Sequence, residues 1–372
     1  MSAPSQIDLG EPQCVTLRDA IATRFEIVPP ADAPDRPPRH SSFKAYTRGC
    51  LHDADGARVD LSVRVGGVGG DQAMSIDPDV LPPGQRGGTW LSGRTLYLGT
   101  FMNHYGHFIT ESLSRYWRQE AAGFDHFVAY PFMHDHGEIR IQAFHRYLAG
   151  LLEVPLDRMA VLRSQTVFDE IVVPEQLWTY NTHVNASMRE LYGRITAHHA
   201  GRRSSGRLFL SRTRSPRLAN ALAVEEAFAG FGFRVLYPER IPIAEQLALY
   251  ANCEILAGLS GSAMHNCLFA RPGLMTIEVG DARARHKPVR MQLIANELAQ
   301  VDARFIPFGE AEGSRIDPSV VRKGLRDALG ELPRYGPLIL LRLKRGFGRL
   351  AARPRPRKRS RPKAQADLRG GS

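Results

Sequence analysis

The sequence predicts an α/β protein with two lobes. Its 372 residues are enough for two domains with separate cores, and 43% of them are apolar, as in globular proteins. From residue 95 onward, short strand-like runs alternate with segments of helical periodicity. This alternation is typical of parallel sheets with helices on both faces. We expect a ligand cleft between the two lobes.

Residues 1–94 are predicted to form an irregular, β-rich N-terminal region. The glycine cluster GGVGG at 66–70 is followed by no helix that would receive a pyrophosphate, so we expect a loop there. The polar N-terminus lacks the features of a secretory signal, and the spacing of the four cysteines fits no zinc site. We therefore expect a cytoplasmic protein with free thiols.

Residues 95–200 are predicted to form an N-terminal α/β lobe. Its expected strands are RTLYLGT, HFVAYP, AVLRS and EIVVP. Its expected helices are the amphipathic HYGHFITESLSRYWRQE, IRIQAFHRYLAGL and a linking helix at 185–200.

Residues 201–333 are predicted to form a C-terminal α/β lobe with a more regular alternation. Its expected strands are RLFLS, FRVLYP, EILAGL, LMTIEVG and ARFIPFG. The expected helices between them are AVEEAFAGFG, IAEQLALYANC, SAMHNCLFA and KPVRMQLIANELAQ. Right-handed crossovers place all the loops that follow these strands at one edge of the sheet.

The positive charge of the chain is concentrated at its C-terminus. Residues 334–372 hold thirteen Lys/Arg and one acidic residue, which gives this segment a charge of +12. Since the whole chain has a net charge of +11, residues 1–333 carry −1. We expect a disordered tail that meets an anionic membrane surface. The near-neutral remainder argues against a nucleic-acid groove, although non-enzymatic nucleic-acid binding through the tail stays an alternative.

His107 and Glu111 form the first candidate site. They are separated by four positions on one expected helix, so their side chains share a face. A carboxylate or an imidazole there can act as a general base on a hydroxyl group. The alternative is a buried His–Glu pair that only closes the helix.

Charged residues follow two of the expected strands of the second lobe. Arg212 and Arg217 offer forked cationic donors that suit a diphosphate, or else they are solvated loop charges. Glu278 ends another strand, where a carboxylate can accept ribose hydroxyls, or where it is a surface charge.

Small residues follow a third strand. The run includes Gly261, Ser262 and Ala263, with Asn266 one turn later. Small side chains let backbone N–H groups approach a phosphate or a sugar. The alternative is close packing of a helix against the sheet.

Four segments, in order over roughly residues 95–310, resemble those of family 61 glycosyltransferases, which include capsular-polysaccharide-type enzymes. The segments are YGHFITESLSRYW, FLSRTRSPRLAN, IPIAEQLALYANCEILAG and GLSGSAMHNCLFARPGLMTIEV. One departure is clear: the family usually has histidine where this chain has Ser260, and His265 is displaced by more than one helical turn.

The resemblance implies two Rossmann-like lobes in a GT-B-type fold. It implies inverting, metal-independent transfer from a nucleotide sugar, expected to be a UDP-sugar, to a polysaccharide or glycolipid acceptor, with no cofactor. By this resemblance Arg212 and Arg217 clamp the diphosphate, Gly261 and Ser262 line the phosphate and sugar site, and Glu278 lies near the ribose. Glu111, alone or with His107, faces the acceptor. Another nucleotide-sugar enzyme, such as an epimerase, stays an alternative, although no G-x-G-x-x-G follows a first strand.

Overall fold

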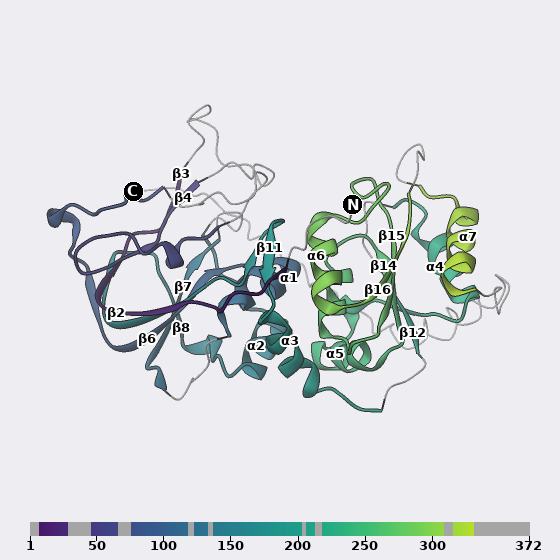
Figure 1. Cartoon of the computed structure of the whole chain (residues 1–372), viewed down its shortest axis with the longest axis horizontal. Coiled ribbons are helices and arrows are strands. Elements are labelled where there is room, and N and C mark those ends of the chain that lie inside the picture. Colours follow the sequence, from purple (N-terminus) through teal and green to yellow (C-terminus); the bar gives the residue numbers. More distant parts are fainter. Residues whose placement is uncertain are drawn as a thin grey trace, which may run out of the picture.

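The computed structural model describes residues 7–28, 46–65, 76–117, 123–132, 137–202, 206–212, 218–308 and 315–330. The chain forms two α/β lobes that lie side by side (Figure 1). The first half of the sequence builds one lobe and the second half builds the other. The α/β class predicted from the sequence is confirmed.

The N-terminal lobe is built on a six-stranded mixed sheet. Its strands, in spatial order, are β5 (Leu51–His52), β2 (Cys14–Ala22), β9 (Thr166–Pro174), β6 (Thr89–Phe101), β7 (His126–Pro131) and β8 (Met159–Val161). The last four strands run parallel to one another, whereas β2 is antiparallel to both β5 and β9.

The boundary expected between residues 94 and 95 falls inside β6. Residues 1–94 also supply β2 and β5 to this sheet, so much of that region belongs to the N-terminal lobe. Sequence periodicity could not reveal this, because the pairing of β2 with β9 joins residues about 150 positions apart.

Smaller elements complete the N-terminal lobe. The helices are α1 (Tyr105–His107), α2 (Ala143–Leu151) and α3 (Met188–Ala197). A small sheet contains β1 (Ile7–Asp8), β11 (His183–Asn185) and β10 (Trp178–Thr179), and a hairpin-like pair contains β3 (Glu26–Val28) and β4 (Tyr46–Arg48).

The C-terminal lobe contains a five-stranded, fully parallel sheet. The spatial order is β13 (Arg234–Leu236), β12 (Arg207–Leu210), β14 (Ile255–Leu259), β15 (Met275–Val279) and β16 (Asp302–Ile306). All five strands were predicted from the sequence and are confirmed. The chain winds from β12 to one side and then from β14 to the other, so a topological switch point lies between β12 and β14.

Helices cover both faces of this parallel sheet, as Figure 1 shows. The helices are α4 (Ala221–Gly230), α5 (Ile243–Asn252), α6 (Arg290–Ala299) and α7 (Pro318–Leu329). Helix α7 was not among the predicted elements. Alternate residues of β12 point to opposite faces: Phe209 packs with α4 and α7, whereas Leu208 and Leu210 join the core on the side of α5 and α6.

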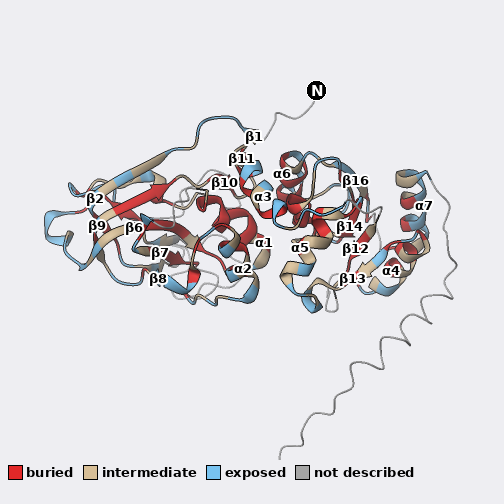
Figure 2. Cartoon of the chain, turned by 90° about the horizontal axis from the view of Figure 1, so that it is seen from below, coloured by how far each residue is buried: buried red, intermediate tan, exposed pale blue. Residues whose placement is uncertain are grey.

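One hydrophobic core passes from lobe to lobe. It includes Phe108 and Tyr192 of the N-terminal lobe together with Leu247, Phe269 and Ile294 of the C-terminal lobe. Figure 2 shows the buried residues continuing through α1, α3, α5 and α6. The lobes therefore share a packed interface, which fixes residues from both at one site.

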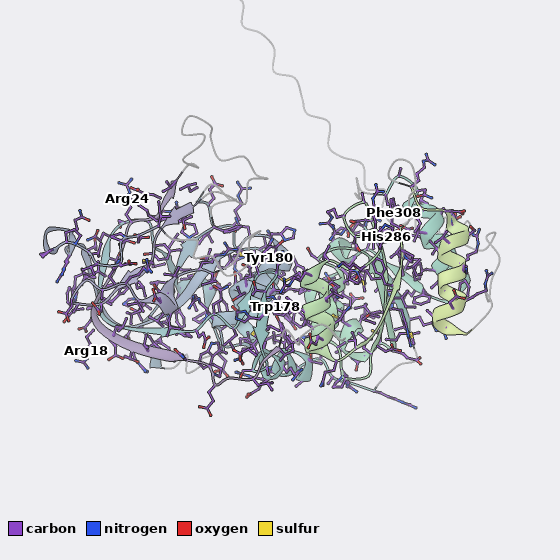
Figure 3. All side chains as sticks on the ribbon, turned by 45° about the horizontal axis from the view of Figure 1, so that its top comes forward. Arg18, Arg24, Trp178, Tyr180, His286 and Phe308 are labelled. Carbon is purple, nitrogen blue, oxygen red and sulfur yellow. The ribbon has the colours of Figure 1, made fainter. Side chains whose placement is uncertain are left out.

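Trp178 also links the lobes. Its ring is fully buried, and its indole N–H lies 3.1 Å from Sδ of Met291 on α6. Figure 3 shows Trp178 and Tyr180 at the border of the two lobes.

Candidate active site

The N-terminal half of the site lies on a short helical segment after β6. The segment begins as α1, continues as a π-helical stretch at Phe108–Ser112 and ends as a 3₁₀ turn at Leu113–Arg115. It is shorter and less regular than the amphipathic helix expected over 104–120. Ser112 Oγ donates to the carbonyl of Thr100 (3.0 Å) and accepts from the N–H of Met102 (3.1 Å), which fastens the segment to the end of β6. Single π-helical turns occur frequently at functional sites.

His107 and Glu111 form a close pair on this segment. Nδ1 of His107 lies 2.6 Å from Oε1 of Glu111, and Nη2 of Arg64 donates to Oε2 of Glu111 at 2.7 Å. The side chain of Glu111 is 1% exposed, that of Arg64 is 12% exposed and that of His107 is 24% exposed. Glu111 thus has both oxygens bonded inside the protein, and His107 is the member of the pair that faces outward.

Burial and charge act in opposite directions on Glu111. Burial raises the pKa of its carboxyl group. The charge of Arg64 and the hydrogen bond from His107 lower the pKa by more than burial raises it, so the pKa of Glu111 lies below its ordinary value. Glu111 is therefore an ionised carboxylate that accepts the Nδ1–H of His107. This bond leaves the lone pair of the imidazole on Nε2.

The C-terminal half of the site surrounds Gly261, directly after β14. Gly261 has a φ of 140°, which disfavours residues with a side chain. A Cβ atom there would lie 3.2 Å from Nη2 of Arg212 and 3.7 Å from Nη2 of Arg283. Two guanidinium groups therefore flank this glycine at the switch point of the sheet. Arg217 and the rest of the 213–217 loop lie outside the described residues.

Arg283 was not predicted as a site residue. It follows β15 by four residues, and this position at the carboxyl edge of the sheet is the signal that could have found it. Its guanidinium group pairs with Asp281 (3.0 Å), and its Nη2 lies 3.5 Å from the carbonyl of Ser260.

Glu278 lies buried at the end of β15, with 2% of the residue exposed. Ser260 Oγ donates a short hydrogen bond to Oε1, and Oε2 has no partner among the described residues. Burial raises the pKa of Glu278 to about 7, and the hydrogen bond from Ser260 opposes this shift. Ser260, which stands where the resembling family has histidine, is thus fully engaged with Glu278.

The two halves of the site meet at Gly106. A Cβ atom on Gly106 would lie only 2.6 Å from Oγ of Ser262, so the start of α1 packs directly on the small-residue turn. Tyr105 OH donates to Oδ1 of Asn266 at 2.5 Å, and Nδ2 of Asn266 donates to the carbonyl of Ala263 at 3.0 Å. The structure therefore brings the His107 pair next to the turn at Ser262 and Ala263.

A cavity of about 650 Å³ opens at this junction. Its lining combines apolar groups with the charged side chains of Arg212 and Glu239 and several other polar side chains, a common composition for small-molecule sites. The residues that line it are His104, Tyr105, Gln142, Ala143, Phe144, Arg212, Pro238, Glu239, Ile241, Pro242, Ile243, Gln246, Ser262, Ala263 and Asn266.

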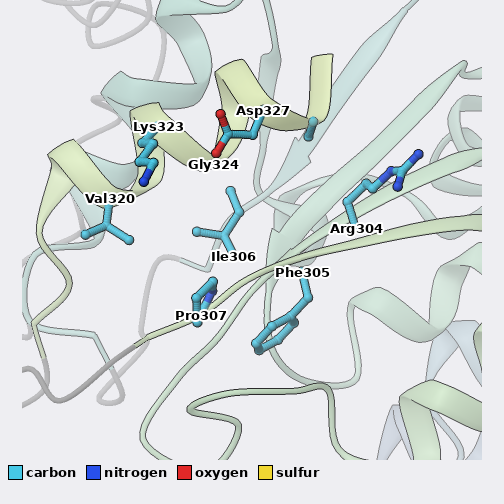
Figure 4. Close-up of a pocket in the computed structure, with 9 residues that line it drawn as sticks. Arg304, Phe305, Ile306, Pro307, Val320, Lys323, Gly324 and Asp327 are labelled. Carbon is cyan, nitrogen blue, oxygen red and sulfur yellow. The ribbon is translucent and has the colours of Figure 1, made fainter. Parts of the chain in front are cut away.

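A second cavity, of about 580 Å³, lies between β16 and α7 (Figure 4). It shares no lining residue with the cavity at the junction. Its lining residues are Arg304, Phe305, Ile306, Pro307, Val320, Lys323, Gly324, Asp327 and Ala328.

The described ranges contain no group of three or more His, Cys, Asp or Glu side chains arranged to hold a metal ion. Within the same ranges, no helix has the length and apolar character required to cross a membrane.

The arrangement suits group transfer between two bound molecules. An oriented imidazole lies on one lobe, and two guanidinium groups lie at the switch point of the other. Residues 105–277 match the family model described as Glycosyltransferase 61, and this range runs from α1 into β15 across both lobes. The chain is thus a glycosyltransferase, an enzyme that transfers sugars.

Over residues 105–277, which lie in both lobes, the chain is similar to glycosyltransferase family 61. The resemblance seen in the sequence is therefore confirmed. A comparison with curated proteins gave no match. Arg64, Glu278 and Arg283 lie outside the matched range.

Proposed function

We propose that this protein transfers a sugar from a nucleotide sugar, a UDP-sugar, to a polysaccharide or glycolipid acceptor, with inversion and without a metal ion. The observation that carries the proposal is the contact of Gly106 with Ser262. This contact joins an oriented histidine on the N-terminal lobe to a cationic switch point on the C-terminal lobe. Such a division between acceptor and donor sides is consistent with a GT-B-type arrangement of two Rossmann-like lobes.

On the acceptor side, His107 is the general base. The acceptor hydroxyl oxygen attacks the anomeric carbon, and its proton passes to Nε2 of His107. Glu111 holds the imidazole in the required tautomer and stabilises the imidazolium that forms, because its carboxylate accepts from Nδ1–H at 2.6 Å. Glu111 itself is too buried to be the base. The sequence had left Glu111 and His107 as rival bases.

On the donor side, Arg212 and Arg283 bind the diphosphate, together with Arg217 as expected from the sequence. The bond between the anomeric carbon and the phosphate oxygen breaks, and its electron pair stays on the diphosphate. Fixed guanidinium groups stabilise that developing charge, which is the role that a metal ion has in other transferases. Gly261 and Ser262 leave room for the phosphate and the sugar.

The nucleoside occupies the cavity at the junction, whose apolar lining includes Tyr105, Phe144 and Ile243. By the family resemblance, Glu278 lies close to the ribose. A base on one lobe opposite the leaving group on the other gives a single displacement, which inverts the anomeric centre. Residues 334–372 lie outside the described residues, and from their charge we propose that they hold the enzyme at the cytoplasmic face of an anionic membrane.

A panel of nucleotide sugars tests the proposal. Thermal unfolding in EDTA should show stabilisation by UDP-sugars, of about 2.7 kcal/mol at a hundredfold excess over the dissociation constant. The ligand that stabilises most should then serve as donor in a transfer assay. Stabilisation by no nucleotide sugar, or only by dinucleotide cofactors, would reject the proposal in favour of another nucleotide-binding enzyme.

A further inference from the structure

We propose that Arg64 is a positioning residue for catalysis, because its guanidinium group keeps Glu111 in the charged form that orients His107. The inference rests on the proposed role of His107 as base. Arg64 donates from Nη2 to Oε2 of Glu111 at 2.7 Å, while the other carboxylate oxygen bonds His107. Arg64 lies outside the matched range of the family and was not predicted from the sequence.

The segment that carries Arg64 is held in place by buried and partly buried side chains. Tyr97 OH donates to the carbonyl of Ser62 at 2.9 Å, and Nη2 of Arg115 lies 3.4 Å from the carbonyl of Val63. Nε2 of Gln176 lies 3.4 Å from the carbonyl of Val65. Donors from three different parts of the chain thus fix the backbone on both sides of Arg64, so its guanidinium group is aimed at Glu111 before any substrate binds.

The guanidinium group is also shielded from water. It lies 4.9 Å above the ring of Phe132, and the side chain is 12% exposed. The ion pair with Glu111 is therefore a buried one, in which loss of one partner leaves the other as an uncompensated charge. A buried carboxylate without its cation takes up a proton.

Protonation of Glu111 would reverse the hydrogen bond to His107. A neutral carboxyl group donates its O–H, so Nδ1 of His107 would become the acceptor and the ring proton would move to Nε2. Nε2 could then no longer take the proton of an acceptor hydroxyl. Arg64 therefore acts through the tautomer of His107 and does not contact the reacting atoms.

Other titratable groups around the pair do not replace Arg64. The Tyr180 ring lies 5.3 Å and the His104 ring 5.5 Å from that of His107. Burial raises the pKa of Tyr180, and burial lowers the pKa of His265 to about 4, so both are neutral at neutral pH. Arg283, which is paired with Asp281 on the C-terminal lobe, has a charge that lowers the pKa of Tyr180 and so opposes the effect of burial.

The test uses Arg64→Met, which removes the charge, and Arg64→Lys, which keeps it. Infrared spectra follow the carboxyl group, and the difference from the matching Glu111→Gln protein isolates the band of protonated Glu111. We expect this band at neutral pH in Arg64→Met but not in Arg64→Lys. We also expect Arg64→Met to transfer sugar about a hundredfold more slowly at neutral pH, with its acidic limb moved upward by about one pH unit or more.

Arg94→Met is the matched control. Arg94 makes an ion pair of similar length but greater exposure with Glu170 (2.8 Å), and it lies 4.7 Å from the ring of Phe124, in the same lobe but away from the site. It should change neither the pH profile nor the infrared band. Calorimetry of nucleotide binding shows that each variant is folded.

The inference is overturned if Arg64→Met is equally slow at all pH values and shows no protonated Glu111, because Arg64 is then only structural. If Arg64→Met does not fold, the infrared spectrum of the unmodified protein tests the inference instead. Its Glu111 band should appear only below the ordinary titration range of glutamate, and a band at neutral pH overturns the inference. Full activity of Glu111→Gln would also overturn the inference, because Arg64 acts through Glu111. Failure of the proposed function looks different: the protein binds no nucleotide sugar, or His107→Gln transfers sugar at the full rate.

Discussion

At the residue scale, burial gives His107 and Glu111 different roles, whereas the sequence predicted only that the two side chains lie close together. Helical spacing predicted that His107 and Glu111 share a face, and the 2.6 Å contact confirms this. Spacing could not tell which of them faces outward, because that depends on Arg64, a residue more than forty positions earlier. The imidazole is therefore our proposed base and the carboxylate its support.

Substitution of each partner tests this assignment. His107→Gln removes the base and Glu111→Gln removes its support, so each should reduce kcat, by a factor of about 10²–10⁴ for His107→Gln. The donor dissociation constant should stay nearly unchanged, since the donor binds the other lobe. His126→Gln, at the start of β7, is the control. Full activity of His107→Gln would show that the base is elsewhere.

The two arginines beside Gly261 should act on the donor. Arg212→Ala and Arg283→Ala should each weaken UDP binding by about 1.5–3 kcal/mol, the range for hydrogen bonds to charged groups. Isothermal calorimetry measures this directly. Arg304→Ala, on the outer strand β16, should have no effect. If Arg283→Ala binds UDP as tightly as the unmodified protein, the second cation does not contact the diphosphate.

Glu278 makes the stability of the protein depend on pH. Burial raises its folded pKa to about 7, above that of the unfolded chain, so its contribution to stability is complete at acidic pH and is lost as pH rises to about 7. Glu278→Gln mimics the neutral acid. Relative to the unmodified protein, its free energy of unfolding should rise between pH 5 and pH 8, by at most about 3 kcal/mol. Urea unfolding at the two pH values measures this. An unchanged difference would show that Glu278 does not titrate in this range.

At the scale of elements, the sequence predicted regular strands better than the irregular helices of the site. Period-2 patterns and apolar runs located all five strands of the C-terminal sheet. The helix expected at SAMHNCLFA is instead a 3₁₀ helix at Met264–Phe269, and the helix after β6 contains a π-helical stretch. Apolar periodicity does not distinguish these forms, which depend on contacts such as those of Ser112 with β6.

The contact between α1 and the small-residue turn yields a prediction about Gly106. Alanine should stabilise an isolated helix by about 1 kcal/mol relative to glycine, but here its Cβ would lie 2.6 Å from Oγ of Ser262. Gly106→Ala should therefore slow transfer by displacing the lobes. Ser262→Gly removes the obstructing atoms, so transfer by Gly106→Ala/Ser262→Gly should match that of Ser262→Gly alone. If Gly106→Ala has normal kcat and KM, the close contact is not required.

At the scale of the whole molecule, the sequence predicted two α/β lobes but not how residues 1–94 join the first. Strand β2 pairs with β9 across most of the N-terminal lobe, and the same region supplies Arg64. Such long-range pairing leaves no local signal. The switch point between β12 and β14 was foreseen only in part: Arg212 and Gly261 were recognised, whereas Arg283 required the fold.

The shared core also explains why both lobes are needed at the site. The packing of Phe108 and Tyr192 with Phe269 fixes the distance between the proposed base and the proposed diphosphate site. A single displacement requires these groups on opposite sides of the anomeric carbon. The stereochemistry of the reaction therefore reports on the arrangement of the whole molecule.

The most direct measurement is the anomeric configuration of the first product, observed by NMR while the enzyme transfers sugar from its preferred UDP-sugar in the presence of EDTA. Our account predicts a product with inverted configuration, formed at the same rate with and without EDTA. A product with retained configuration, or transfer that begins only when a divalent metal ion is added, would contradict it.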